Sequence, residues 1–282
     1  MQVPPPVSCE HPKPVQTSDA PGIASKVGVG WFAFAALLLV LLLASANLQP
    51  PSRLVYALVF TFGFAVLAWS LRGATRSGAI AGFLVTSLLF IAEGSAMFGA
   101  VLLVFILTFA ATKLGKDRKQ QLTAEPAGGR DGAQVLANLG VAALAAAGAT
   151  LTGMRLPFLV AALAVLAEAA CDTVASESGK ALAREARLIT SGKIVAAGTN
   201  GAVSFAGTLL GALAAGLVAL EAIVTGLLKA RFGVVIVIAG IVGMLLDSLL
   251  GATLERRGWL TNNLVNLIST GASATMAAVV AW

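Results

Sequence analysis

The chain has 282 residues, of which 58% are apolar and only 11% are charged. Soluble domains hold roughly 45–50% apolar and ~25% charged residues, so this composition excludes an ordinary soluble domain and indicates an integral membrane protein. The net charge of +6 reflects basic residues that orient a membrane protein in the bilayer. We therefore do not interpret it as a sign of nucleic-acid binding.

Residues 1–27 are rich in Pro, Ser and Thr and have no periodic apolar face. Such a segment cannot bury enough apolar surface to fold, so we expect a disordered cytoplasmic tail. We expect no signal peptide, because its apolar region would begin too late in the chain. The single histidine, His11, lies in this tail, so a histidine base or a zinc site is poorly supported.

The rest of the chain, residues 28–282, is expected to form one transmembrane domain. A span needs about 20 mostly apolar residues, and several windows qualify with very few charges. The predicted fold class is therefore all-α, a polytopic transmembrane helical bundle of about nine spans. The third span is short, and Glu93 followed by Gly94 predicts a tight helical hairpin or a re-entrant pair with the fourth. The expected spans are 28–46, 54–71, 78–92, 96–112, 133–151, 155–171, 201–223, 231–251 and 261–281.

The distribution of basic residues predicts the orientation. With nine spans, the tail and the loops after spans two, four, six and eight share one face of the membrane. Nearly all of the 19 Lys and Arg residues lie on that face. The positive-inside rule therefore places the amino terminus and the long loops in the cytoplasm. The residues left on the opposite face are Arg53, Arg155, Lys229 and Arg231.

Polar residues in or beside several spans gather at the same cytoplasmic face. Lipid makes such residues costly unless they face a bundle interior or a water-filled cavity, so they are functional candidates. The opposite face has mostly short loops with few polar residues. We therefore predict a polar pocket that opens to the cytoplasm. Its candidate residues are Lys113, Asn138, Asp172, Thr173, Ser176, Glu177, Thr199, Asn200, Gly201, Ser204, Asp247, Ser248, Asn263 and Asn266.

The residue types of this pocket indicate its chemistry. Mg²⁺ is bound by one or two carboxylates together with phosphate oxygens, and lysine and arginine neutralise the remaining phosphate charge. The glycines of GTNGAVS, residues 198–204, precede a helix, whose free amino-terminal N–H groups can bind an anion. Together these features predict a phosphoryl-transfer site, in which positioning and charge stabilisation do most of the catalytic work.

Several polar and small residues also have a purely structural interpretation. Glu168 shares a helix face with Asp172, but it could be protonated or paired inside the bundle, so its role stays open. The basic cluster KLGKDRK, residues 113–119, could be only a topology anchor. Gly207 and Gly211 fit a helix interface, where small residues allow close approach.

Five motifs, taken in order along the chain, resemble a known family. They are TKLGKDRK at 112–119, DTVASESG at 172–179, GTNGAVSFAG at 198–207, DSLLGAT at 247–253 and NNLVN at 262–266. The set resembles domain of unknown function family ninety-two, the transmembrane protein nineteen / phytyl-phosphate kinase family, over about residues 72–282. The family's DT-x-A-S-E pattern matches from Asp172 to Glu177. Its T-N-G-G pattern matches Thr199 to Gly201 and departs at Ala202.

This resemblance implies an isoprenoid (phytyl/geranylgeranyl-type) monophosphate kinase that transfers a phosphoryl group from CTP or another nucleotide triphosphate to give the diphosphate. The implied cofactor is Mg²⁺, and the partners are membrane lipid, isoprenyl monophosphate and the nucleotide. The acceptor already carries an anionic oxygen, so no strong general base is needed. We expect a multi-pass protein of the cell (inner) membrane with its site facing the cytoplasm. The donor base, the isoprenoid length and the oligomeric state stay open.

Under this hypothesis each candidate residue has a role. Asp172 and Asp247 hold one or two Mg²⁺ ions, and Glu177 supports that metal site or binds the nucleotide. Lys113 and Lys119 neutralise phosphates. The other candidates bind the nucleotide or phosphate, or complete the pocket: Thr173, Ser176, Thr199, Asn200, Gly201, Ser204, Ser248, Asn263 and Asn266.

Two other functions fit the same polar pocket. A polyprenyl-phosphate transporter or scramblase also needs a polar cavity and basic residues. Transporters usually contain internal repeats that pair broken helices at the bilayer midplane. The only sign of a repeat in this sequence is a weak similarity between residues 73–82 and residues 198–207. A lipid cytidylyltransferase would use the same metal and phosphate groups, and the sequence barely distinguishes it from a kinase.

Overall fold

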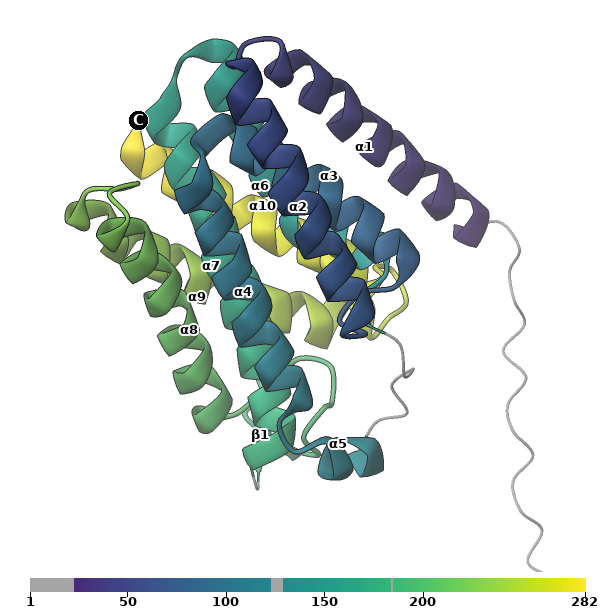
Figure 1. The fold of residues 1–282 in the computed structure, drawn as a ribbon. Coiled ribbons are helices and arrows are strands. Elements are labelled where there is room, and N and C mark those ends of the chain that lie inside the picture. The colour runs from purple at the N-terminus through teal and green to yellow at the C-terminus, as the bar shows by residue number, and fades with distance from the viewer. Residues whose placement is uncertain (1–22, 123–128, 184) are drawn as a thin grey trace, which may run out of the picture.

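The computed structural model describes residues 23–122, 129–183 and 185–282, which form a bundle of long helices (Figure 1). Residues 1–22 of the expected disordered tail lie outside the described residues. The first helix begins at Ile23 rather than at residue 28, so the expected boundary of the tail is too late. The helices are α1 (Ile23–Ala46), α2 (Pro51–Ser70), α3 (Arg76–Glu93), α4 (Ser95–Lys113), α5 (Lys116–Leu122), α6 (Gly132–Thr152), α7 (Arg155–Leu182), α8 (Phe205–Val224), α9 (Gly233–Leu250) and α10 (Asn262–Ala281).

The helices have the lengths that a membrane requires. Eight of the described helices are long and apolar enough to cross a bilayer, and α1 adds a shorter apolar stretch over Gly30–Ala46. The prediction of an all-α polytopic bundle of about nine spans is therefore confirmed. The third and fourth spans, α3 and α4, are full-length helices joined at Gly94, whose φ of 88° allows the tight turn. They form a helical hairpin, and each helix is long and apolar enough to cross a bilayer, which favours the first of the two expected arrangements.

The sixth span is much longer than expected. Helix α7 has 28 residues, so it is about 42 Å long at 1.5 Å per residue and extends well beyond a hydrocarbon core of about 30 Å. The expected end at residue 171 is wrong, because the polar stretch that follows Cys171 continues the same helix. Counted from Arg155, Asp172 lies about 26 Å along the axis.

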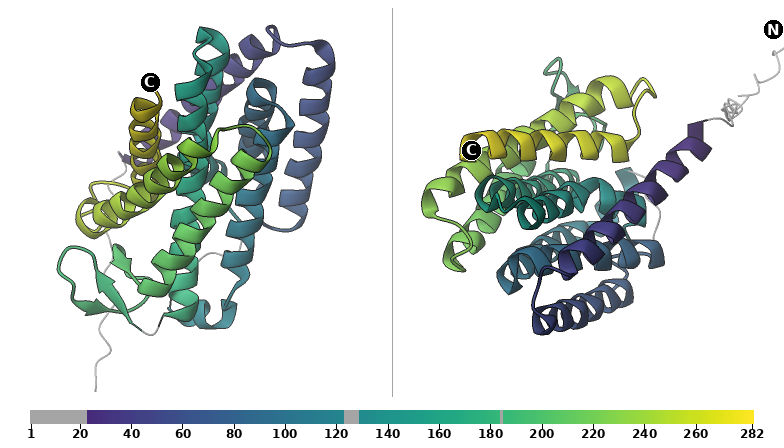
Figure 2. Two further views of the ribbon diagram at one scale, coloured as in Figure 1. Left: turned by 90° about the vertical axis from the view of Figure 1, so that its left-hand side faces the viewer. Right: turned by 90° about the horizontal axis from the view of Figure 1, so that it is seen from above.

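Helix α7 lies at the centre of the bundle. Seen from above, α6 and α7 lie between α9 and α10 on one side and α2 to α4 on the other (Figure 2). Small residues allow these close contacts. A Cβ at Gly211 of α8 would lie 2.6 Å from the carbonyl oxygen of Cys171, and a Cβ at Gly207 would lie 2.5 Å from that of Ala175. The interpretation of Gly207 and Gly211 as helix-interface residues is confirmed.

A short antiparallel sheet, which the sequence did not predict, connects α7 to α8. Its strands are β1 (Ala186–Leu188), β2 (Ile194–Val195) and β3 (Ala202–Val203), in the order β2-β1-β3. The sheet and α5 lie at the same end of the bundle (Figure 1). Two short irregular helices complete the described chain, η1 (Ala230–Phe232) and the π-helical turn η2 (Gly251–Glu255).

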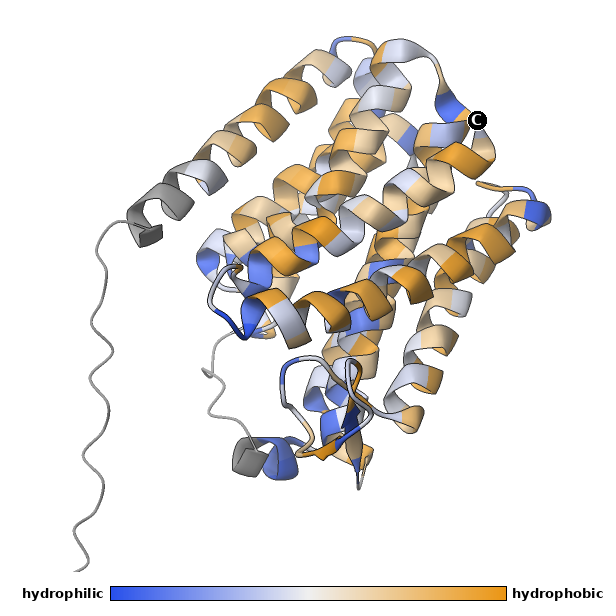
Figure 3. Ribbon diagram, turned by 180° about the vertical axis from the view of Figure 1, so that it is seen from behind, coloured by the Kyte–Doolittle hydropathy of each residue, from blue (hydrophilic) through white to orange (hydrophobic). Residues whose placement is uncertain are grey.

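The two ends of the bundle differ in polarity. Hydrophilic residues gather at the end that holds α5 and the sheet, whereas the helices between the ends are largely apolar (Figure 3). We call this the polar end, and define it by residues 71–75, 114–115, 129–131, 185–204 and 251–261. At the opposite end Glu93 forms an ion pair with Arg155 at 2.9 Å, which matches the two faces expected from the basic residues.

Candidate functional site

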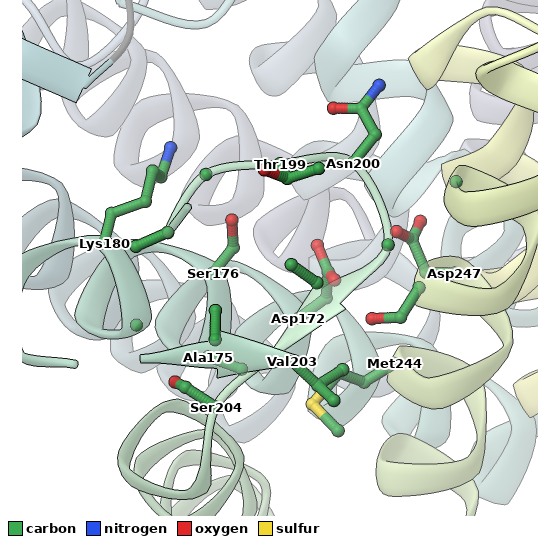
Figure 4. Close-up of a pocket in the computed structure, with 18 of the residues that line it drawn as sticks. Asp172, Ala175, Ser176, Lys180, Thr199, Asn200, Val203, Ser204, Met244 and Asp247 are labelled. Atoms are coloured by element: carbon green, nitrogen blue, oxygen red, sulfur yellow. The ribbon is translucent and has the colours of Figure 1, made fainter. Parts of the chain in front are cut away.

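Asp172 and Asp247 face one cavity of about 300 Å³ at the polar end (Figure 4). Asp172 comes from α7 and Asp247 from α9, 75 positions later in the chain. Two carboxylates that face a shared cavity repel each other unless a cation or a proton lies near them. The cavity is therefore suited to bind a cation.

The loop before α8 covers this cavity and supplies Thr199 and Asn200 (Figure 4). Gly201 has a φ of 75°, and a Cβ on it would clash with Ala252 in the turn η2. A glycine is therefore needed for both the backbone conformation and the close packing of the loop on η2. Ser204 accepts a hydrogen bond from the N–H of Gly207 at 3.1 Å and so caps α8.

The α9 side of the cavity ends in a turn of π-helix. Asp247 and Ser248 line the cavity one turn before η2, and such π-helical turns are frequent at functional sites. The amide of Asn266 fits its surroundings when its nitrogen faces Asp247, to which it then donates a hydrogen bond of 2.9 Å. In this orientation the Asn266 oxygen accepts from Asn138 at 3.2 Å, so α6 and α10 together position Asp247.

A second polar cavity, of about 220 Å³, lies beside the first. Asp172, Ser176 and Lys180 line both cavities. These three residues are spaced by four along α7, so they form one stripe on its surface. The second cavity is also lined by Arg130, Gln134, Asn138, Thr173, Glu177, Asn262 and Asn266.

Arg130 is fixed in place by both its backbone and its side chain. Its N–H donates to the carbonyl of Gly73 at 3.0 Å, and its carbonyl accepts from the N–H of Thr75 at 3.0 Å. Its guanidinium donates to the hydroxyls of Thr108 at 3.0 Å and Thr173 at 3.3 Å. Two donors of the guanidinium are thus used for positioning, and an arginine has five.

The charge on Arg130 persists despite its surroundings. Burial lowers the pKa of Arg130, whereas the nearby carboxylates of Glu177 and Asp172 oppose that decrease. An arginine pKa is high enough for the side chain to stay protonated even so. Within the described residues, no carboxylate lies within 4.0 Å of the Arg130 guanidinium. The group therefore presents a positive charge to the second cavity.

Glu177 is held by two lysines. Its Oε2 lies 2.6 Å from Lys119 Nζ and its Oε1 lies 2.7 Å from Lys180 Nζ. Both carboxylate oxygens are engaged, so the geometry gives no support to Glu177 as a metal ligand. Lys119 also donates to the carbonyls of Ala111 at 3.0 Å and Thr112 at 2.6 Å. It lines neither cavity, and its contacts connect α4, α5 and α7.

Two other expected site residues lie away from both cavities. Lys113 is exposed, with its Nζ 5.0 Å from the centre of the Phe109 ring. Asn263 lines neither cavity, whereas its neighbour Asn262 lines both. The expected roles of Lys113 and Asn263 therefore lack geometric support. Of the remaining candidates, Thr173 and Asn266 line the second cavity, Ser176 lines both, and Thr199, Asn200, Gly201, Ser204 and Ser248 line the first.

Glu168 now has a structural explanation. It is buried within the bundle and accepts a hydrogen bond of 2.7 Å from the hydroxyl of Ser269 in α10. Gly243 of α9 provides the space, because a Cβ there would lie 2.5 Å from Glu168 Cγ. Glu168 lines neither polar cavity, so we assign it to packing between α7, α9 and α10.

The described residues fit Mg²⁺ better than a metal held by the protein alone. Among them, no group of three or more His, Cys, Asp or Glu side chains is placed to hold a metal ion. Mg²⁺ commonly takes one or two carboxylates and completes its octahedron with water and substrate phosphates. Asp172 and Asp247, facing an open cavity, match that donor set.

Several residues that line the cavities were not among the sequence candidates, and three of them are Arg130, Lys180 and Asn262. Arg130 and Lys180 were counted only as topology charges, and Asn262 was passed over for Asn263. Lys180 could have been found from its spacing, because it lies two helical turns after Asp172 on the same face. Arg130 follows a glycine in a loop, and no local pattern marks it as buried.

The fold and the arrangement of polar residues define an integral, multi-pass membrane protein. A family model described as "Integral membrane protein DUF92" matches residues 59–274, and the chain belongs to this family. The resemblance seen in the five motifs is thereby confirmed. No solved structure matches the chain.

Named relatives occur in plants and cyanobacteria. Protein PGR of Arabidopsis thaliana is 37% identical over 239 residues, which cover 75% of this chain and 82% of that protein. Protein VTE6, chloroplastic, from the same plant is 32% identical over 232 residues, which cover 78% of this chain and 68% of that protein. The uncharacterized membrane protein sll0875 of Synechocystis is 37% identical over 184 residues, or 63% of this chain and 70% of that protein.

Proposed function

We propose that the protein is an isoprenyl-monophosphate kinase that uses a nucleotide triphosphate, CTP in the first instance, as the phosphoryl donor. One observation carries the proposal: Asp172, Ser176 and Lys180 form the shared wall of two polar cavities, one also lined by Asp247 and Glu255 and the other also lined by Arg130. Two anionic substrates could therefore meet at α7. The family resemblance, with its phytyl-phosphate kinase members, supports the same function.

In this proposal the cavity with Asp172 and Asp247 takes the nucleotide. Its volume of about 300 Å³ suits a triphosphate and part of the nucleoside. The loop of Thr199 and Asn200 lies over it and offers hydroxyl, amide and backbone groups. When bound between the two carboxylates, Mg²⁺ would neutralise phosphate charge and orient the terminal phosphate.

The second cavity takes the phosphate of the acceptor lipid. Arg130 and Lys180 are the cations that face it, and the guanidinium fork matches phosphate oxygens well. An acceptor oxygen attacks the terminal phosphorus, a new P–O bond forms, and the bond to the leaving nucleoside diphosphate breaks. The acceptor oxygen is already anionic, so the site needs no strong general base.

Lys180 lies between the proposed nucleotide cavity and the proposed acceptor cavity. It lines both cavities, and Glu177 orients it through the 2.7 Å ion pair. A cation at the shared wall lies where negative charge builds up during phosphoryl transfer. We place this polar end in the cytoplasm, in a cell (inner) membrane, because the basic residues are concentrated there.

The test uses the full-length protein, purified and reconstituted in lipid nanodiscs. Phytyl monophosphate and γ-labelled CTP are added with Mg²⁺, and the labelled lipid diphosphate and CDP are quantified. The proposal expects a label on the lipid and one CDP per lipid product. Release of pyrophosphate would instead establish a nucleotidyltransferase. No labelled lipid with any of the common nucleotide triphosphates would overturn the proposed function.

A further inference from the structure

A third cavity, largely apolar, adjoins the cavity of Arg130. It has a volume of about 80 Å³ and is lined from five helices, α2, α3, α4, α6 and α7. Most of its lining is aliphatic, aromatic or glycine, including Phe64, Val101 and Phe105. The cavity lies inside the bundle at the level where α3 begins, and its largely apolar lining suits an apolar ligand.

The polar and apolar cavities share one boundary. Arg130, Asn138 and Thr173 line both of them. The guanidinium of Arg130 therefore lies where the apolar space changes into the polar space. Three cavities thus follow one another around α7: the apolar cavity, then the cavity with Arg130, then the cavity with Asp247.

From this order we infer that the apolar cavity binds the first part of the acceptor's hydrocarbon chain, and that Gly82 sets how bulky this part can be. The inference rests on the proposed function, and it adds the subsite that selects the acceptor. The ligand chemistry is an amphiphile with one anionic phosphate and an apolar chain joined directly to it. The anionic end matches Arg130 and the chain matches the apolar walls.

The cavity exists because α3 is unusually rich in glycine along one side. Gly78 and Gly82 both line it. A Cβ at Gly78 would clash with the carbonyl of Arg130, so Gly78 is needed for α3 to approach the arginine backbone. Gly82 is different, because a Cβ there would meet nothing within 4 Å. A larger side chain at Gly82 would therefore extend into open cavity space.

The substitution Gly82→Leu separates chain binding from folding. Glycine costs roughly 1 kcal/mol relative to alanine inside a helix, so a larger residue with free space should not weaken α3. The matched control is Gly63→Leu. Gly63 lies on the exposed face of the neighbouring helix α2, a Cβ there also meets nothing within 4 Å, and it lines none of the three cavities.

The experiment measures binding and turnover in nanodiscs. Native mass spectrometry gives the bound fraction of phytyl monophosphate for wild type, Gly82→Leu and Gly63→Leu in the absence of nucleotide. Kinase assays then compare KM for phytyl monophosphate and KM for CTP. For Gly82→Leu we expect phytyl monophosphate to bind about tenfold more weakly, equivalent to the loss of roughly two buried methylene groups. The KM for CTP and the Gly63→Leu control should match wild type.

Each outcome decides a different point. Equal binding of phytyl monophosphate by wild type and Gly82→Leu would overturn the apolar subsite. Weakened binding of phytyl monophosphate and of CTP to the same extent would point to a general distortion and would also overturn it. If wild type binds the lipid and Gly82→Leu does not, yet no phosphoryl transfer occurs, the subsite stands and the proposed kinase function falls.

Discussion

Lys119 Nζ lies 2.6 Å from Glu177 Oε2, and this ion pair connects α5 to the polar end of α7. Lys180 engages the other oxygen of the same carboxylate at 2.7 Å. Both lysines and Glu177 are buried. One carboxylate therefore holds two lysines beside the cavity that we assign to the acceptor phosphate. With both of its oxygens engaged, Glu177 has a geometry that favours positioning of the lysines.

Replacing Glu177 by glutamine should reduce stability but leave the metal requirement unchanged. Removing one partner of a buried ion pair typically costs about 3–5 kcal/mol, because the other charge is left uncompensated. We expect Glu177→Gln to lower the melting temperature in nanodiscs. The Mg²⁺ concentration that gives half-maximal activity should equal that of wild type. A several-fold increase in that concentration would restore Glu177 as a metal ligand.

The carboxylate pair should control the Mg²⁺ dependence. Asp172→Asn and Asp247→Asn each keep the side-chain size and remove the charge. We expect kcat to fall by about 10²–10³, as when one group that stabilises the transition state is lost, and the Mg²⁺ requirement to rise. Asp117→Asn is the matched control, since Asp117 is exposed on α5 and lines neither polar cavity. Full activity in either Asp172→Asn or Asp247→Asn would exclude that residue from the metal site.

Gly201 should be sensitive to substitution for two separate reasons. Gly201→Ala strains a backbone with φ of 75° and creates a clash with Ala252. Gly192→Ala isolates the first effect, because Gly192 has φ of 67° and a Cβ there meets nothing within 4 Å. The backbone strain costs roughly 1–2 kcal/mol in both variants. Only Gly201→Ala should raise KM for the nucleotide, because only there does the loop move away from η2. Equal effects of the two variants on KM would contradict this prediction.

Arg130→Lys should weaken the acceptor site in a pH-dependent manner. A lysine keeps the charge but loses the guanidinium fork that contacts Thr108 and Thr173, so we expect KM for the lipid phosphate to rise about tenfold. Burial lowers the pKa of a cation at this position. A lysine, whose ordinary pKa is lower than that of arginine, should therefore lose its charge as the pH rises above neutrality. KM measured from pH 6 to pH 9 should increase in Arg130→Lys and stay constant in wild type. A flat profile in the variant would show that its charge is not lost in this range.

Short-range sequence patterns predicted the spans. They also predicted Asp172 and Ser176, which line both polar cavities. Apolar length predicted the helices because lipid cannot satisfy a backbone that is not hydrogen-bonded within the helix. The same patterns failed for the lysines. Lys113 and Lys119 flank one motif and seemed equivalent, yet one is exposed on α4 and the other is buried against Glu177. Adjacent residues on a helix point about 100° apart. The predicted residue Asn263 therefore points away from the cavities, whereas its neighbour Asn262 lines both of them.

The sequence by itself determined the class of the protein, the nine spans, the polar end and the pairing of Asp172 with Asp247 as the central acidic residues. These depend on composition, on apolar length and on the cost of charge in lipid, which are local properties of the chain. Only the tertiary structure showed that Arg130 and Lys180 line the cavities whereas Lys113 and Lys119 do not. Which side chains face the cavities depends on how α3, α4 and α6 pack around α7. That packing is set by the rotation of each helix and by how closely the glycines allow neighbouring helices to approach.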